Sequence, residues 1–158
     1  MLSISRTTDE DVEACVELLS ILFAQEAEFE ADPARHRAGL RALLARPDTA
    51  LLYCAREGRT IIGMVSLLLT VSTALGEPVA WLEDLVVAPT ARGRGVGTAL
   101  LEFAIAEARR RGLKRVTLLT DPHNRGAQEL YQRFGFTRSE MVVYRRLLGS
   151  PPSPSSDS

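Results

Sequence analysis

The sequence predicts one α+β domain built on a mixed β-sheet, and three observations indicate it. The 158 residues are enough for a single domain that buries a core. Apolar residues first recur at every third or fourth position, as in helices, and from residue 50 onward they form strand-like runs. A strand–helix–strand section, residues 79–120, needs parallel neighbours, whereas a strand–turn–strand section, residues 50–71, is antiparallel. The sheet should therefore contain both kinds of pairing.

The first part of the chain predicts a short strand and two helices. Residues 2–6 alternate in polarity and form the strand, and one of the two threonines that follow caps a helix. The inner face of this helix is formed by Val12, Cys15, Val16, Leu19, Leu22 and Phe23. Asp32-Pro33 marks the start of a second helix, which should end before Pro47.

The remaining elements follow from apolar runs and the turns between them. Glu57-Gly58 predicts a hairpin turn, Pro89 ends a strand, and Gly112 can end a helix. The predicted strands are 50–56, 60–71, 79–88, 115–120 and one or two more within 136–148, and the predicted helices are about 96–111 and 124–134. The Pro/Ser-rich tail, 149–158, is expected to be disordered. The single domain should therefore span residues 1–148.

Composition excludes several classes of protein. Hydrophobic residues make up 46% and charged residues 25% of the chain, which are ordinary globular values. Neither a membrane-spanning run nor a signal peptide is found, so we expect a cytoplasmic protein that does not contact membranes. The two cysteines, Cys15 and Cys54, are interpreted as reduced core thiols. No metal site is expected, because ligand spacing is absent.

The net charge of −1 hides an uneven distribution of charge. Residues 7–34 hold nine acids and no base, whereas residues 92–146 hold twelve bases and five acids. One interpretation is two solvated faces of opposite sign, and the other is a basic half that holds phosphate with an acidic half near a cation. The near-neutral total and the low aromatic content of 6% disfavour a nucleic-acid-binding module.

A glycine-rich turn between the strand 79–88 and the next helix is the strongest chemical signal. Its residues are Arg92, Gly93, Arg94, Gly95, Val96, Gly97 and Thr98. Glycines let backbone amides approach a ligand, and the first amides of a helix are unpaired, which predicts phosphate binding. The turn is not a Walker A loop, and Thr98 stands where a dinucleotide fingerprint needs glycine. The alternative is a tight turn with incidental arginines.

These residues resemble the Gln/Arg-x-x-Gly-x-Gly/Ala loop of the GCN5-related N-acetyltransferases. Residues 82–89 (LEDLVVAP) are similar to the fourth strand of that family, and residues 124–136 (NRGAQELYQRFGF) to its Asn/Tyr segment. The resemblance covers residues 2–148. It implies a V-shaped sheet of six or seven strands with helices on both faces, and acetyl-CoA as cosubstrate.

The resemblance also implies where acetyl-CoA binds. Its pyrophosphate would lie on the amides of residues 92–98. Its pantetheine arm would pair with the backbone of Leu85, Val86 and Val87, with Asn124, Ala127 and Tyr131 nearby. Tyr131 would face the thioester sulfur. Direct attack by a primary amine is expected, because neither cysteine is near the thioester.

Two residues are candidates for the proton transfers of this reaction. The phenol of Tyr131 is protonated at neutral pH and can donate to the leaving thiolate, although it could simply pack on its helix. Glu83 is the candidate base. The alternative is that Glu83 is a structural charge paired with an arginine. Asp84 is a weaker candidate for the base. Simple alternation would place Trp81, Glu83, Leu85 and Val87 on one face of the strand and Leu82, Asp84 and Val86 on the other.

The acceptor is predicted to be a small cationic amine. The acidic segment of Glu26, Glu28, Glu30 and Asp32 should overhang the acceptor pocket, although such a run is equally typical of a solvated loop. Trp81 could line the same cleft, and His123 is interpreted as a surface residue. The sequence does not identify the acceptor and leaves the oligomeric state open, a homodimer included. The alternative function is a catalytically idle acetyl-CoA-binding sensor or assembly subunit of the same fold.

Overall fold

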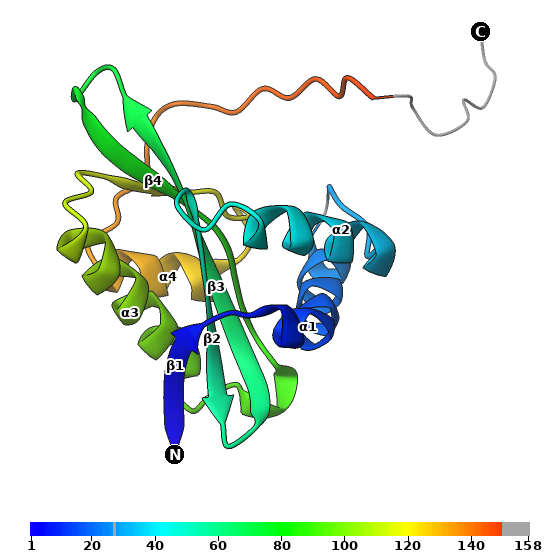
Figure 1. Cartoon of the computed structure of the whole chain (residues 1–158). Coiled ribbons are helices and arrows are strands. Elements are labelled where there is room, and N and C mark those ends of the chain that lie inside the picture. The colour runs from blue at the N-terminus through cyan, green and yellow to red at the C-terminus, as the bar shows by residue number, and fades with distance from the viewer. Residues whose placement is uncertain (27, 150–158) are drawn as a thin grey trace, which may run out of the picture.

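The sheet has five strands that lie in the order of the chain (Figure 1). The computed structural model describes residues 1–26 and 28–149. Its strands are β1 (Leu2–Arg6), β2 (Ala50–Glu57), β3 (Thr60–Ser72), β4 (Glu77–Val87) and β5 (Val116–Leu118). Neighbours from β1 to β4 are antiparallel, whereas β5 is parallel to β4. The predicted mixed sheet and the α+β class are thus confirmed.

The expected number of six or seven strands is too high for the part of the chain that the structure describes. Residues 136–148 were predicted to contain one or two strands, but none forms there. An extended segment becomes a strand only when a neighbour completes its hydrogen bonds, and no described strand pairs with this one. The tail predicted to be disordered, 149–158, lies outside the described residues apart from Gly149.

Helices cover both faces of the sheet (Figure 1). One face carries α1 (Val12–Gln25) and α2 (Pro33–Leu44), and the other carries α3 (Val96–Arg110) and α4 (Arg125–Arg133). Two short 3₁₀ turns, Asp9–Asp11 and Pro89–Ala91, precede α1 and follow β4. Each face has its own apolar core, so the sheet is the middle layer of three.

A half-buried ion pair fixes the start of α1 against β2. The two terminal guanidinium nitrogens of Arg56, Nη2 and Nη1, donate to the Asp11 carboxylate at 2.7 and 2.9 Å. The backbone N–H of Thr8 also donates to Asp11, at 2.8 Å, which completes the predicted cap. The hydrogen bonds from Arg56 are the main reason that the pKa of Asp11 falls to about 2.

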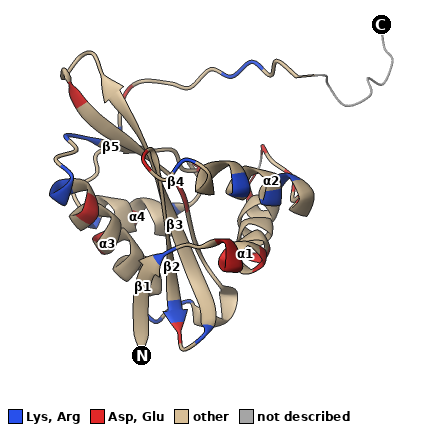
Figure 2. Ribbon diagram, viewed as in Figure 1, with Lys and Arg blue, Asp and Glu red and all other residues tan. Residues whose placement is uncertain are grey.

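The two cysteines are buried free thiols, as predicted. Cys15 on α1 and Cys54 on β2 meet with their Sγ atoms 3.5 Å apart. The described residues contain no group of three or more His, Cys, Asp or Glu side chains that could hold a metal ion. No helix in the described part of the chain is long and apolar enough to cross a membrane. Figure 2 shows Lys and Arg on α2, near the β2–β3 turn and at the end of α3 rather than in one stripe.

Candidate active site

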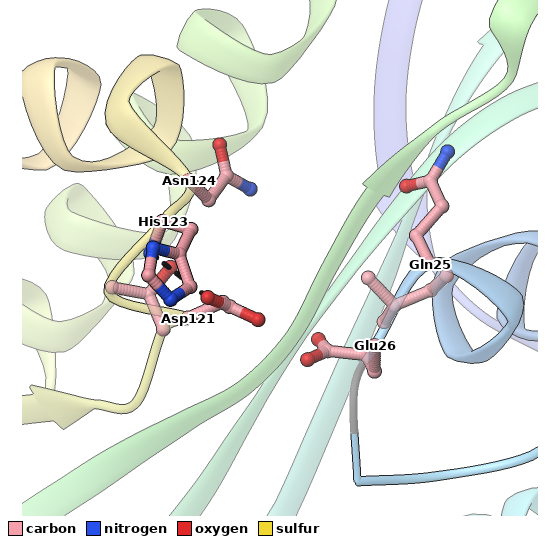
Figure 3. A pocket seen from close by; sticks show the side chains of 7 residues that line it. Gln25, Glu26, Asp121, His123 and Asn124 are labelled. Carbon is pink, nitrogen blue, oxygen red and sulfur yellow. Dashed lines mark hydrogen bonds between the residues drawn. The ribbon is translucent and has the colours of Figure 1, made fainter.

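Two adjoining cavities lie between β4, β5, α4 and the end of α1. The larger, of about 270 Å³, is lined by Leu22, Gln25, Glu26, Thr120, Asp121, His123 and Asn124 (Figure 3). The smaller, of about 90 Å³, is lined by Leu22, Glu26, Leu82, Glu83, Leu85, Leu119, Thr120, Asn124, Ala127 and Tyr131. Five residues predicted for the site therefore border the same small cavity, namely Glu83, Leu85, Asn124, Ala127 and Tyr131.

The cavities exist because β4 and β5 separate. The two strands are paired only from Ala80 to Leu82 on β4, and β4 then continues alone on that side to Val87. Beyond Leu82, no described strand lies along this edge of β4. The backbone of Leu85 and Val87 therefore borders an opening in the sheet, where an extended ligand could pair with it.

A β-bulge on β4 changes which side chains share a face. Leu82 pairs with Leu67 and Leu85 pairs with Val65, so two residues of β4, Glu83 and Asp84, stand opposite one residue of β3. That residue is Ser66, whose Oγ accepts a hydrogen bond from the backbone N–H of Asp84 at 3.2 Å.

The bulge makes the predicted alternation wrong. Leu82, Leu85 and Val87 all pack with the core under α3, whereas simple alternation would separate Leu82 from the other two. Val86 packs with the core under α1. The extra residue shifts the period by one position, so each side chain beyond the bulge points to the opposite side from the predicted one.

The two acids at the bulge differ in environment. Glu83 is exposed and lines the smaller cavity, whereas Asp84 is partly buried. Burial, followed by the charges of Glu83 and Glu26, raises the pKa of Asp84 to about 7. No ion pair within the described residues involves either acid, so the arginine partner considered for Glu83 is not found there. The site thus holds one accessible carboxylate and one carboxyl group that titrates near neutrality.

Tyr131 lies on α4 and lines the smaller cavity opposite β4. Its ring packs edge-on against Phe136, with centroids 5.8 Å apart. Burial, and to a smaller extent the charge of Glu26, raises the pKa of Tyr131 above its usual value. The phenol is therefore protonated at neutral pH and is available as a hydrogen-bond donor to a group in the cavity.

The glycine-rich turn has the conformation of an anion-binding loop. Gly93 and Gly95 have φ angles of 77° and 80°, which favour glycine, and Gly95 is the N-cap of α3. The first intrahelical bond of α3 runs from Ala99 N to Gly95 O, so the preceding amides of the helix have no such partner. A Cβ placed on Gly97 would meet only Val87, at 3.6 Å.

The two arginines of this turn are engaged by the protein itself. Arg92 donates to the carbonyl oxygen of Val87 at 3.3 Å. Arg94 forms a two-pronged ion pair with Glu57, with both N–O distances 3.1 Å. Because both guanidinium groups already donate within the protein, the hydrogen-bond donors that this turn offers to a ligand are mainly backbone amides. The arginines supply mainly positive potential near the turn.

The acidic segment after α1 is divided between several roles. Only Glu26 reaches the cavities, and it points toward Asp121 across the larger one (Figure 3). Glu28 pairs with Arg145, and Asp32 caps α2 through the backbone N–H of Arg35. Burial and then the charge of Asp121 raise the pKa of Glu26. The prediction that the whole segment overhangs the pocket is thus correct for Glu26 alone.

Sequence reasoning missed two residues of the larger cavity. Asp121 and His123 line it, although Asp121 was not considered and His123 was interpreted as surface. His123 is exposed and still faces the cavity. Asp121 could have been found from its position directly after a strand predicted to run parallel to β4, because such ends meet at one edge of the sheet. Trp81 is half exposed and lines neither cavity.

Asn124 occupies the junction of the two cavities and begins α4. Its side-chain oxygen accepts from Ala127 N at 3.1 Å, which leaves its amide nitrogen facing the open space. The arrangement offers an accessible carboxyl group at Glu83, a phenol at Tyr131 and amides without intrahelical partners at the start of α3. Such a set suits the transfer of an acyl group from a phosphate-bearing carrier to a nucleophile.

Comparison with known proteins gives consistent similarities. A model of the acetyltransferase (GNAT) family matches residues 13–136. An uncharacterized N-acetyltransferase of Bacillus subtilis, YhfO, is 36% identical over 126 residues, which is 78% of this chain and 84% of that one. The aminoalkylphosphonate N-acetyltransferase of Salmonella typhimurium is 29% identical over 140 residues, 89% of this chain and 88% of that one. The structure of an aminoglycoside N-acetyltransferase in complex with CoA superposes with a TM-score of 0.76 at 22% identity, covering 93% of this chain and 95% of that one.

Proposed function

The chain belongs to the acetyltransferase (GNAT) family and is therefore an acyltransferase, and we propose that it transfers the acetyl group of acetyl-CoA to the primary amine of a small cationic molecule. The observation that carries this proposal is the convergence of three features at one place. The anion-binding turn of α3, the opening between β4 and β5, and the cavity lined by Glu83 and Tyr131 follow one another along the edge of β4.

The residues present fit acetyl-CoA. The free amides at the start of α3 would hold its pyrophosphate, with Gly93, Gly95 and Gly97 leaving room for close approach. The unpaired backbone of β4 from Leu85 to Val87 would hydrogen-bond the pantetheine arm as an added strand. The Asn124 amide nitrogen faces the same opening. This course would bring the thioester into the smaller cavity.

Two side chains of that cavity would manage the protons. The amine nitrogen attacks the thioester carbonyl carbon, the carbon–sulfur bond breaks, and sulfur leaves as thiolate. Glu83 would accept the proton that the amine loses, and the Tyr131 hydroxyl would give its proton to the thiolate. A backbone amide of β4 near the bulge would meet the carbonyl oxygen while it carries negative charge. Asp84 lies beside Glu83 and is the second candidate for the base.

The charge of the larger cavity supports a cationic acceptor. Glu26 and Asp121 face each other across it, and Glu83 lines the adjoining smaller cavity. Two facing carboxylates repel each other, and a bound ammonium group would relieve that repulsion. The named relatives acetylate amines of different kinds, an aminoalkylphosphonate in one case and an aminoglycoside in the other. The local charge favours an acceptor closer to the second kind.

Thermal unfolding with and without acetyl-CoA tests the cofactor. At about one hundred times its dissociation constant, a ligand adds roughly 2.7 kcal/mol of stability. Gly97→Asp should remove this gain, because the new side chain disturbs only the Val87 contact in the fold but blocks the amides. Gly39→Asp on α2, where a Cβ meets nothing within 4 Å, is the matched control. Stabilisation by ATP or NADH in place of acetyl-CoA would contradict the proposal.

Thiol release over a panel of amines tests the transfer itself. An active enzyme releases free CoA when a suitable cationic amine is added. Binding of acetyl-CoA without turnover of any amine would instead favour the catalytically idle sensor or assembly subunit. A best substrate that is anionic would retain the transferase and overturn the cationic acceptor.

A further inference from the structure

An ion pair joins the glycine-rich turn before α3 to the turn between β2 and β3. The two terminal nitrogens of Arg94 donate to the two carboxylate oxygens of Glu57, the last residue of β2, at 3.1 Å each. The two turns meet because Gly63 of β3 stands opposite Val87 of β4, which places both turns at one end of the sheet (Figure 1). Among the ion pairs of the described residues, this one alone includes a residue of the glycine-rich turn.

The start of α3 is held in place without this ion pair. Val96 and Leu100 are buried, and a Cβ placed on Gly63 would lie 2.9 Å from Leu100 and 3.3 Å from Val96. The first turn of the helix therefore packs directly on the backbone of β3. The ion pair lies at the surface, where the side chain of Arg94 is 49% and that of Glu57 39% exposed. An ion pair with that exposure adds little to stability, so Glu57 contributes little to the fold.

The Glu57 carboxylate opposes the binding of an anion at the glycine-rich turn. Arg94 directly precedes Gly95, the N-cap of α3, and the amides that follow have no intrahelical partners. A guanidinium group binds phosphate with the same two-pronged geometry that it uses for a carboxylate. While both prongs of Arg94 are engaged by Glu57, a phosphate can bind the guanidinium only by displacing the carboxylate. The negative charge of Glu57 also repels an anion nearby.

We propose that Glu57 competes with the pyrophosphate of acetyl-CoA for Arg94 and thereby limits how tightly the protein holds CoA. The inference rests on the proposed function, because it takes the anion at the turn to be part of acetyl-CoA. Arg94 pairs with Glu57 in the free protein and with the pyrophosphate in the complex, which leaves Glu57 to solvent. Glu57 thus acts through Arg94 and does not touch the reacting atoms. A competing charge of this kind favours release of the product CoA, a step that limits turnover in many enzymes.

Calorimetric titration of the full chain with CoA, the unreactive product, is the first test. Glu57→Gln removes the charge and keeps the shape, so the dissociation constant of CoA should fall about threefold at low salt and less at high salt. Glu13→Gln is the matched control and should leave that constant unchanged. Glu13 also forms a two-pronged exposed ion pair, with Arg37 at 2.7 and 2.8 Å, but it lies on α1. Unchanged or weaker binding of CoA in Glu57→Gln would overturn the proposal.

A double-variant cycle tests whether Glu57 acts through Arg94. Arg94→Gln should weaken CoA binding, and Glu57→Gln added to it should bring little further change. An equal gain with and without Arg94 would mean that the charge of Glu57 acts on the ligand directly, and would refute the competition. Dephospho-CoA keeps the pyrophosphate and lacks the phosphate on the ribose, so Glu57→Gln should bind it more tightly by the same factor. Loss of the gain with dephospho-CoA would overturn the assignment to the pyrophosphate.

Steady-state kinetics separate this inference from the proposed function. Glu57→Gln should be inhibited by product CoA at about threefold lower concentration, with an unchanged KM for the acceptor amine, a combination that damage to the fold would not produce. CoA binding by the unaltered protein with no gain in Glu57→Gln would refute the competition and leave the acetyltransferase standing. Absence of CoA binding in the unaltered protein and in every variant would refute both.

Discussion

Replacing Asp84 by asparagine should stabilise the protein at alkaline pH and leave it unchanged at acid pH. Burial raises the pKa of Asp84 from 3.8 to about 7 in the folded state, with Glu83 and Glu26 adding to the effect. In the unfolded chain the carboxyl group ionises near its ordinary value. The folded protein therefore holds a proton that the unfolded chain releases, and stability falls as pH rises from about 4 to about 7. Asparagine has no proton to lose, so the variant escapes this penalty.

The size of the effect follows from the two pKa values. Linkage between 3.8 and about 7 gives a loss of about 2.5 kcal/mol between pH 5 and pH 8 for the unaltered protein. The free energy of unfolding is measured in urea at pH 5 and at pH 8. Between these two values it should fall by about 2.5 kcal/mol more in the unaltered protein than in Asp84→Asn. With a urea slope of roughly 2 kcal/mol per molar, the extra shift of the midpoint is about 1 M. The double difference cancels the titrating groups that do not interact with Asp84.

Glu83→Gln is the internal control. Glu83 is exposed, and removing its charge should lower the pKa of Asp84 only in part, because burial is the larger cause of the raised value. Parallel loss of stability in Asp84→Asn and the unaltered protein would mean that water reaches Asp84 freely, and would refute the reasoning. Turnover gives a second readout on the same variants. If Glu83 is the base, Asp84→Asn keeps most of the activity and Glu83→Gln does not.

Other predictions concern catalysis, acceptor binding and the helix start. Tyr131→Phe should lower turnover about a hundredfold at all pH values with acetyl-CoA affinity nearly unchanged, whereas Glu83→Gln should recover as pH rises and supplies neutral amine. Parallel pH–rate profiles would contradict these separate roles. Glu26→Gln with Asp121→Asn should raise KM for a cationic amine about tenfold, roughly 1.4 kcal/mol, and an unchanged KM would remove both from the acceptor site. Asp11→Asn should lower the free energy of unfolding by about 2 kcal/mol at neutral pH, because the pKa of Asp11 in the folded protein, about 2, lies below the ordinary 3.8. The difference between the variant and the unaltered protein should vanish as pH falls through about 2. Urea unfolding at neutral and acid pH checks this.

Local patterns predicted most elements to within a few residues. The strand expected at 60–71 is Thr60–Ser72, and the helix expected at 96–111 is Val96–Arg110. Both carry their own signals, since apolar periodicity and flanking glycines act within the segment itself. Five residues that border the smaller cavity (Glu83, Leu85, Asn124, Ala127 and Tyr131) were predicted for a different reason, because their motifs resemble those of a known family.

Features that depend on a partner were not predictable from local patterns. The bulge at Glu83 and Asp84 adds one residue without changing strand propensity, and only the pairing with Ser66 reveals it. Residues 136–148 have strand-like composition, but an extended segment becomes a strand only when a neighbour completes its hydrogen bonds, and none of the described strands pairs with this one. Asp121 lies at the site because the chain passes there after β5, and in the sequence only its position after a predicted parallel strand indicates this.

The bulge also determines how this part of the protein could change over generations of mutation. It absorbs one additional residue of β4, so Leu85 and Val87 stay on the side of the sheet that Leu82 faces. Deleting either acid would restore the plain alternation, keep both apolar side chains on the α3 side, and leave a hairpin with every rung of its ladder. Such a deletion would keep the topology and the apolar faces of the sheet, but it would remove the bulge and one of its two carboxyl groups. Because the bulge joins Ser66 of β3 to Glu83 and Asp84 of β4, a chimera that keeps it would carry both strands together.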